Sequence, residues 1–318
     1  MAKYIDAQTR AKRMKVRRAR RFATYACIAV FVLSISLVVV KVIEHFGAKN
    51  DKPLLLDSSG TDQTTDMGEQ TKKGYEGIIG PMAEALGAEL ILPDMTTIQV
   101  TENGRVDLSY FDDAVFIGDS LADGFREYKA ATGLTNSTYL TAKSTTPRSF
   151  TQGGFIKIKD SDEPVHAFNT IEQLNPKKVY VTLGTNALMA MEPAEFMETY
   201  YEFIRVLKEK APNAVIYVTS ITPTTATTSA AEPRLEVNRI YQTNCLIAKM
   251  CSEQGLAFLN VYDIFKNDSG YLKDEIAYNE GIHLKPSGYK MWVEYLISHT
   301  VYSPDSQYIL GSPYFLIG

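Results

Sequence analysis

The sequence predicts an α/β fold in which helices cover both faces of a parallel sheet, preceded by one transmembrane helix near the N-terminus. Three observations support this prediction. Apolar strand-like runs alternate with longer helix-like stretches from residue 114 to residue 298, the pattern typical of a parallel sheet with crossover helices. A long uncharged run lies near the N-terminus. A polar, turn-rich segment separates this run from the alternating region.

Five strands and five helices are expected in the alternating region. Short apolar runs predict strands at 114–117, 137–142, 178–183, 214–220 and 257–261. Longer amphipathic stretches predict helices at 121–132, 166–174, 194–210, 234–254 and 286–298. Ahead of them, residues 98–102 and 105–109 alternate around Asn103-Gly104, which predicts a β-hairpin at the entry to the domain.

The N-terminal region predicts a membrane anchor. Residues 1–21 form a basic tail with nine Lys or Arg against one acid, and Phe22–Val40 is then free of charge for 19 residues. Such a run crosses about 30 Å of hydrocarbon, and its basic flank stays cytoplasmic. We assign 22–42 to an uncleaved signal anchor, 43–74 to a flexible linker and 75–318 to the main domain. A cleaved signal peptide is the alternative, although residues 40–46 offer no small-x-small cleavage site.

Charge and cysteine content narrow the functional classes. Residues 22–318 carry 24 Lys or Arg and 36 Asp or Glu, an acidic balance that disfavours nucleic acid as a partner. Cys245 and Cys251 lie in one predicted helix and point to different faces, so they are expected to be buried thiols. The spacing of Cys and His suggests no zinc site, and we expect no metal or other cofactor.

The tetrapeptide Gly118-Asp119-Ser120-Leu121 follows the first predicted strand directly and precedes a helix. A serine on such a turn presents its hydroxyl at the carboxyl edge of the sheet, where open α/β folds bind ligands. Because a serine hydroxyl is a poor nucleophile at neutral pH, it needs a base within hydrogen-bonding reach.

Two further blocks supply the partners of this serine. Asn186, in Gly184-Thr185-Asn186 after the third predicted strand, can donate a hydrogen bond to an oxyanion. His283 follows the last strand and has Glu280 three residues before it, the parts of a Ser-His-acid relay. In this order the blocks resemble the SGNH (GDSL) family of esterases and acylhydrolases over about residues 110–300. The resemblance implies a three-layer, flavodoxin-like sheet.

The resemblance also assigns roles to residues. It implies Ser120, His283 and Glu280 as catalytic residues, and an oxyanion hole made by Ser120, Ser144 and Asn186. Gly184 and Thr222 are expected beside the substrate, since 221–225 follows a strand and lines the mouth of the site. The sequence departs from the family pattern at three places: Ser144 stands for a glycine, Ala187 for an aspartate and Glu280 for an aspartate.

The other histidines are weaker candidates for the base. His45 adjoins the predicted anchor, His166 begins a helix after a polar stretch, and His299 ends an amphipathic helix. An isolated histidine is more often a surface or core residue than a catalytic one.

Three functions remain open at this stage. The first is an extracytoplasmic, single-pass membrane serine esterase that removes small acyl groups, such as acetyl, from a surface glycan. The same acyl-serine chemistry could transfer the acyl group to a sugar hydroxyl instead. The third is a non-catalytic binding module, suggested by the departures at Ser144, Ala187 and Glu280. The expected partners are an acylated substrate and the membrane, with no nucleic acid.

Overall fold

Five parallel strands form the sheet at the centre of the computed structural model, which describes residues 92–102, 104–156, 163–304, 306–310, 312 and 315. The strands are β1 (Ala114–Gly118), β2 (Thr138–Thr141), β5 (Lys178–Thr182), β6 (Val215–Thr219) and β7 (Ala257–Leu259). They lie in the order β2-β1-β5-β6-β7. Counted within this sheet alone, the order is 2-1-3-4-5, the flavodoxin-like arrangement. The predicted parallel α/β sheet is confirmed.

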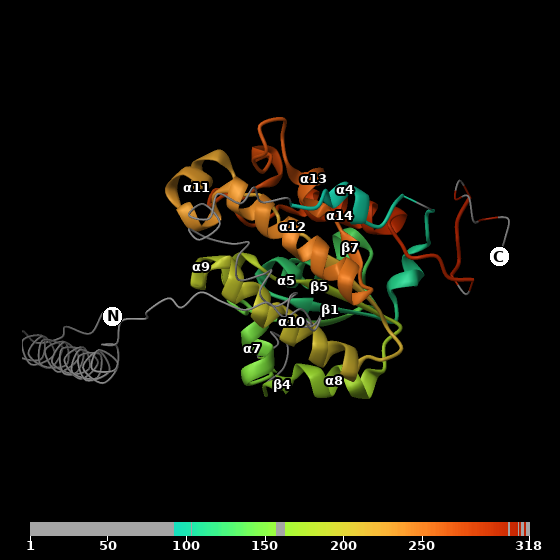
Figure 1. Cartoon of the computed structure of the whole chain (residues 1–318). Coiled ribbons are helices and arrows are strands. Elements are labelled where there is room, and N and C mark those ends of the chain that lie inside the picture. The colour runs from blue at the N-terminus through green and yellow to red at the C-terminus, as the bar shows by residue number, and fades with distance from the viewer. Residues whose placement is uncertain are drawn as a thin grey trace, which may run out of the picture. The chain divides into compact units, whose positions relative to one another are not determined.

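Helices lie on both faces of this sheet (Figure 1). The longer ones are α5 (Ser120–Glu127), α8 (Ala167–Leu174), α10 (Pro193–Lys210), α12 (Val237–Gln254) and α14 (Pro286–Ser298). The short ones are α4 (Met95–Ile98), α6 (Lys129–Thr132), α7 (Pro147–Gln152), α9 (Thr185–Ala190), α11 (Ala226–Ala231) and α13 (Val261–Phe265). Three 3₁₀ turns, η1 (Leu108–Phe111), η2 (Pro233–Leu235) and η3 (Asp274–Ile276), and a small hairpin of β3 (Phe155–Ile156) and β4 (Val165–His166) complete the described elements.

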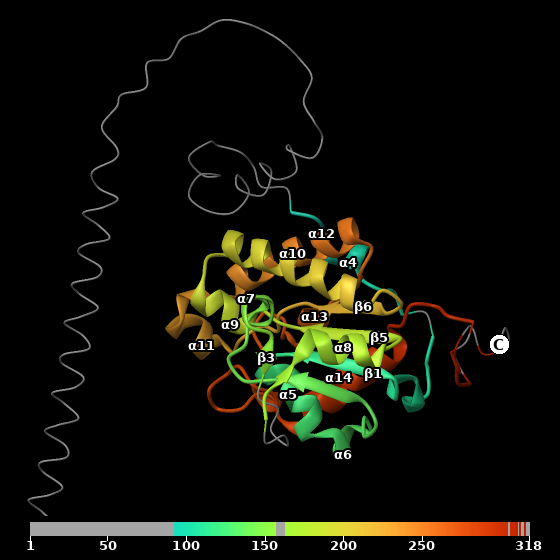
Figure 2. The ribbon, with the colours of Figure 1, turned by 90° about the horizontal axis from the view of Figure 1, so that it is seen from below.

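The strands are buried on both faces because two helical layers enclose them. Val115 and Ile117 of β1 belong to the core beneath α8, α10 and α12. Phe116, which points to the opposite face, packs on Phe125 of α5 with ring centroids 5.0 Å apart. This alternation within a fully apolar strand establishes the three-layer α/β/α arrangement, and the turned view in Figure 2 shows the same layers.

Most of the predicted elements are present, with bounds within a few residues of those expected. The expected helix at 121–132 is two helices, since the chain leaves helical geometry at Tyr128. The expected helix at 234–254 begins as the 3₁₀ turn η2 and becomes α-helical at Val237. Cys245 and Cys251 are buried and unpaired, as predicted.

The predicted hairpin around Asn103-Gly104 is wrong. Met95–Ile98 is the short helix α4, which begins where the Asp94 carboxylate accepts the Thr96 amide. Leu108–Phe111 is a 3₁₀ turn. The Val100 amide donates to the Phe258 carbonyl of edge strand β7 at 2.8 Å. A pairing with the edge of the main sheet therefore replaces the local pairing that the alternating pattern suggested.

The predicted basic tail (1–21), anchor (22–42) and linker (43–74) lie outside the described residues. Among the helices of the described ranges, none combines the length and hydropathy that a membrane span requires.

Candidate active site

Ser120 is the first residue of α5, directly beyond the carboxyl end of β1. The Asp119 carboxylate caps the helix by accepting the Leu121 amide at 2.9 Å, and the Asp119 amide donates to the Thr182 carbonyl of β5. A side chain at Gly118 would place its Cβ 2.0 Å from that carbonyl oxygen. The turn therefore needs glycine at 118, and it holds Ser120 between β1 and β5, where the strand order reverses and such sheets bind ligands.

His283 reaches Ser120 from a loop that lies 163 residues further along the chain. Its Nε2 is 2.8 Å from the Ser120 Oγ, and its Nδ1 is 2.8 Å from the Glu280 Oε1. The loop is closed by main-chain bonds from the Tyr278 amide to the His283 carbonyl and from the Gly281 amide to the Tyr278 carbonyl. The ring thus lies between a hydroxyl and a carboxylate, an arrangement that can take the serine proton and stabilise the imidazolium.

Glu280 binds His283 twice. The same Oε1 that contacts the ring also accepts the His283 amide at 3.1 Å. Burial by itself would raise the pKa of the Glu280 carboxyl, but hydrogen bonds from its own backbone and from His283 outweigh burial and leave the pKa below its ordinary value. The carboxylate is therefore ionised at neutral pH, as an acid in this position must be.

Asn186, in the first turn of α9, donates its side-chain amide to Asp119 Oδ2 at 3.1 Å. An asparagine amide has two hydrogens, so one remains for an oxyanion. Burial raises the pKa of Asp119 to about 6, although hydrogen bonds from Leu121 and Asn186 act in the opposite direction. The buried carboxylate both begins α5 and orients the Asn186 amide.

Ser144 lies in the turn after β2 with φ of 60°, in the left-handed region that favours glycine. Its side chain is exposed. The turn rests against the Ser120 strand, because the Ala142 amide and the Thr145 hydroxyl both donate to the Gly118 carbonyl, at 3.1 and 3.2 Å. Ser144 therefore adopts a left-handed conformation that glycine would adopt with less strain, and its N–H is retained.

Three hydrogen-bond donors lie on the segments around the serine turn. The Ser120 amide begins α5, and first-turn amides have no partner within a helix. The Ser144 amide lies beyond the end of β2 and the Asn186 side chain beyond the end of β5, and these two strands flank β1. Together they form a candidate oxyanion hole of the composition that the sequence predicts.

Gly184 and Thr222, the two residues predicted to contact substrate, are buried. Gly184 begins α9, and a Cβ there would lie 2.3 Å from the Ile221 side chain, so close packing requires glycine. Thr222 is only 3% exposed. Their predicted contact with substrate stays a prediction. Ala187, which stands for the aspartate of the family pattern, is buried within α9.

The remaining described histidines have structural roles. His166 caps α8 by accepting the Asn169 amide. The ring of His299 stacks on that of Tyr295 at 3.8 Å between centroids. His45 lies outside the described residues. Among the residues with described positions, no group of three or more His, Cys, Asp or Glu side chains could hold a metal ion.

The Ser-His-Glu arrangement is open to solvent. The side chains of His283 and Glu280 are 42% and 48% exposed. Two cavities of about 430 and 520 Å³ are lined by the opposite, amino-terminal ends of the strands, including Lys178 and Val215 in the first and Val215 and Ala257 in the second. Neither cavity includes Ser120, Asn186 or His283, so neither serves this site.

Sequence reasoning missed the partner of Asn186. That Asp119 would cap a helix follows from its place before Ser120 and could have been predicted. Its contact with Asn186 joins residues 67 positions apart and has no local signal.

Comparisons with known proteins found a matching family and several similar solved structures. The sequence model of the GDSL-like lipase/acylhydrolase family matches residues 116–291, more than half of the chain. No curated protein matches the chain significantly.

Solved structures of similar proteins include a GDSL-like lipase from Bacteroides thetaiotaomicron, at 14% identity and TM-score 0.45, with 71% of this chain and 96% of that one covered. The lipase/acylhydrolase from Enterococcus faecalis is 15% identical with a TM-score of 0.42 (58% and 93% covered). Phospholipase A1 from Streptomyces albidoflavus is 12% identical with a TM-score of 0.41 (59% and 98% covered). At these values the structures say nothing about substrate.

Proposed function

Because the chain belongs to the GDSL-like lipase/acylhydrolase family and is a serine ester hydrolase, we propose that it removes small acyl groups, such as acetyl, from a glycan outside the cytoplasm. The observation that carries the catalytic assignment is the His283 ring, 2.8 Å from both Ser120 Oγ and Glu280 Oε1.

In the proposed reaction Ser120 Oγ attacks the carbonyl carbon of the ester while its proton moves to Nε2 of His283. The carbonyl oxygen becomes an oxyanion and accepts hydrogen bonds from Asn186 and from the backbone at 120 and 144. Collapse of this intermediate expels the alcohol, which takes the proton from His283. A water then attacks the acyl-serine with the same base, releasing the acid and restoring the Ser120 hydroxyl.

The exposure of the site supports a small acyl group on a large alcohol. A long acyl chain needs an apolar cavity beside the nucleophile to offset its removal from water, whereas an acetyl group buries little apolar surface and can be bound at an exposed site. A polymer such as a glycan can approach an exposed His283–Glu280 loop without entering a pocket. The same openness admits a sugar hydroxyl in place of water, so acyl transfer is the second candidate.

The proposed location follows from the sequence alone. Nine basic residues precede the uncharged run Phe22–Val40, an order that keeps the N-terminus cytoplasmic and the domain outside. External protease acting on intact cells should then release the domain by cutting within 47–74. Recovery of a mature chain that begins near Gly47 would show instead that a signal peptide is removed.

A chain-length series tests the activity. The full chain in detergent should hydrolyse p-nitrophenyl acetate faster than p-nitrophenyl esters of eight or more carbons, and the Ser120→Ala variant should hydrolyse neither. Product analysis with an acetyl donor and a candidate glycan then separates hydrolysis from transfer. Equal or faster turnover of long-chain esters would contradict the small-acyl assignment.

A further inference from the structure

We propose that Thr228 of α11 is a positioning residue, which sets the orientation of Glu280 and, through it, of the His283 ring. The inference rests on the proposed roles of Ser120, His283 and Glu280. It assigns a function to the segment 221–236, of which the sequence places only 221–225 at the mouth of the site.

Two threonines hold the backbone of the acid–base loop. The Thr228 hydroxyl donates to the Glu280 carbonyl at 2.8 Å, and the Thr225 amide donates to the Gly281 carbonyl at 3.0 Å. The Thr225 hydroxyl donates in turn to the Thr228 hydroxyl at 3.1 Å. Because a carbonyl can only accept, the direction of this chain of hydrogen bonds is fixed: the Thr228 hydroxyl donates to the Glu280 carbonyl and accepts from the Thr225 hydroxyl.

The fit at Gly281 shows how closely the two segments meet. Gly281 has φ of 72°, and a Cβ there would lie 2.1 Å from the Thr225 hydroxyl and 2.2 Å from that of Thr228. Any other residue would be strained by its backbone and would collide with both hydroxyls. The tight turn that separates Glu280 from His283 is therefore shaped to the threonine pair.

Glu280 needs such an external contact because the hydrogen bonds that its carboxylate makes to His283 stay within the loop. The Glu280 carboxylate binds the ring and the amide of His283, and these bonds move with the loop. Both side chains are nearly half exposed, so surrounding side chains restrict them less than they would in a buried site. The bond from Thr228 fixes the main chain of the residue whose carboxylate holds the ring.

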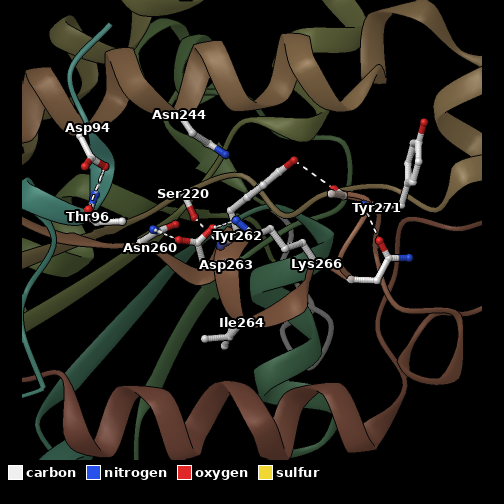
Figure 3. A network of polar contacts seen from close by, with 12 residues as sticks. Asp94, Thr96, Ser220, Asn244, Asn260, Tyr262, Asp263, Ile264, Lys266 and Tyr271 are labelled. Carbon is white, nitrogen blue, oxygen red and sulfur yellow. Dashed lines mark hydrogen bonds and ion pairs between the residues drawn. The ribbon is translucent and has the colours of Figure 1, made fainter.

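The segment that carries Thr228 is itself well anchored. Asn244 of α12 binds both the amide and the carbonyl of Ile221, at 2.7 and 2.9 Å, and Figure 3 shows its side chain pointing from the helix toward the chain after β6. At the other end the Arg234 guanidinium donates to the Met189 carbonyl of α9 at 2.6 Å. The segment thus connects the acid–base loop with the helix that carries Asn186.

The experiment uses the full chain in detergent, with p-nitrophenyl acetate as substrate. Thr228→Val removes the hydroxyl and keeps the side-chain shape, Thr228→Ser keeps the hydroxyl, and Thr227→Val makes the same change at the exposed neighbouring residue of α11. Thr228→Val should lower kcat by about fivefold to tenfold with KM within about twofold, since misplacing a catalytic group costs rate rather than binding. Thr228→Ser should recover most of this loss, and Thr227→Val should match the unmodified protein.

A double-mutant cycle separates positioning from a purely structural effect. In a Glu280→Gln background the carboxylate is already lost, so adding Thr228→Val should lower kcat by less than about twofold. The inference is overturned if Thr228→Val behaves like Thr227→Val, or if it has its full effect in the Glu280→Gln background. Should Thr228→Val not fold, Thr228→Ala against Thr227→Ala makes the same comparison. A Ser120→Ala variant that retains turnover would instead contradict the proposed function itself.

Discussion

The two halves of the active site are held in opposite ways. On the nucleophile side, Asp119 is 1% exposed and links Ser120, at the end of β1, to Asn186, beyond the end of β5. On the other side, Glu280 and His283 are nearly half exposed and lie on a loop. The sheet therefore fixes the nucleophile and the oxyanion donor, whereas hydrogen bonds from neighbouring segments fix the base and its acid.

Substitutions on the two sides should therefore have different effects on stability and on turnover. Removing a polar group from a buried network leaves its partners without hydrogen bonds and costs stability as well as function. Changing a side chain on an exposed loop costs little stability, so its effect should be confined to turnover. Substitutions on the nucleophile side should lower both stability and turnover, and those on the acid–base side should lower mainly turnover.

The largest effect is expected at Ser120 itself. Ser120→Ala removes the atom that bonds to the acyl group, so kcat/KM for p-nitrophenyl acetate should fall at least about 10³-fold. His283→Ala should lower kcat/KM by a similar factor, because Ser120 and His283 act as a unit. Steady-state kinetics of the two single variants and the double variant measure this. A double variant far slower than either single one would show that the two residues act independently.

Asp119→Asn should have the next largest effect. It keeps an oxygen for the Leu121 amide but turns an NH₂ group toward the NH₂ of Asn186, and so releases the oxyanion donor. Loss of one such donor costs about 10²–10³ in kcat, and about 10² is expected here. Activity within threefold of the unmodified protein would contradict the orienting role of Asp119.

The same substitution should change how stability depends on pH. The pKa of Asp119 is raised by burial from 3.8 to about 6, so the folded protein binds this proton more tightly than the unfolded chain. Its stabilisation is complete below pH 4 and is lost as the pH rises through 6, by about 3 kcal/mol. Glu280 has a lowered pKa, and its contribution is lost in the opposite direction, as the pH falls. Urea denaturation at pH 4 and pH 8 should show the Asp119 difference, and Asp119→Asn should abolish it.

On the loop side, Glu280→Gln should lower kcat by at least about tenfold, a loss of about 1.4 kcal/mol of transition-state stabilisation. Glu280→Asp should retain much of the activity, because it restores the acid of the family pattern. The thermal midpoints of both variants should stay close to that of the unmodified protein. Near-normal turnover by a folded Glu280→Gln enzyme would show that a Ser-His dyad suffices.

The smallest effect is expected for Ser144→Gly. A left-handed residue other than glycine is strained by about 1–2 kcal/mol, part of which is offset by the greater freedom of glycine in the unfolded chain. The free energy of unfolding should rise by about 0.5–1 kcal/mol, with kcat within about twofold because the N–H is unchanged. Asn175→Gly is the matched control. Among the described residues, Asn175 is the other non-glycine residue with a positive φ, and it lies at the end of α8. A large loss of activity in Ser144→Gly would show that the serine side chain takes part in the site.

The sheet could be predicted because each strand is a compact apolar run buried on both faces. The hairpin expected at 98–109 failed for the opposite reason: the bond from Val100 to Phe258 joins residues far apart in sequence and outweighs a local turn signal. The break at Tyr128 and the two-residue strands of the β3–β4 hairpin likewise have no distinct local pattern.

The site was predictable where a residue type follows a strand end. Ser120 and Asn186 each lie just beyond a recognisable strand, whereas the Glu280–His283 pair lies in a loop after β7, α13 and η3 and was recognised by its spacing. The structure brings the serine, histidine and glutamate within hydrogen-bonding distance. The contacts of Asp119 with Asn186 and of Thr228 with Glu280 were not predictable, because each joins two segments that are far apart in sequence and whose separation depends on the finished fold.

Covalent labelling tests most directly whether Ser120 is the nucleophile. The full chain is treated with a fluorophosphonate probe, and the modified peptide is identified by mass spectrometry, beside the Ser120→Ala variant. One adduct is expected, on Ser120, and none in the variant. An adduct on another residue, or labelling that persists in Ser120→Ala, would show that Ser120 is not the nucleophile.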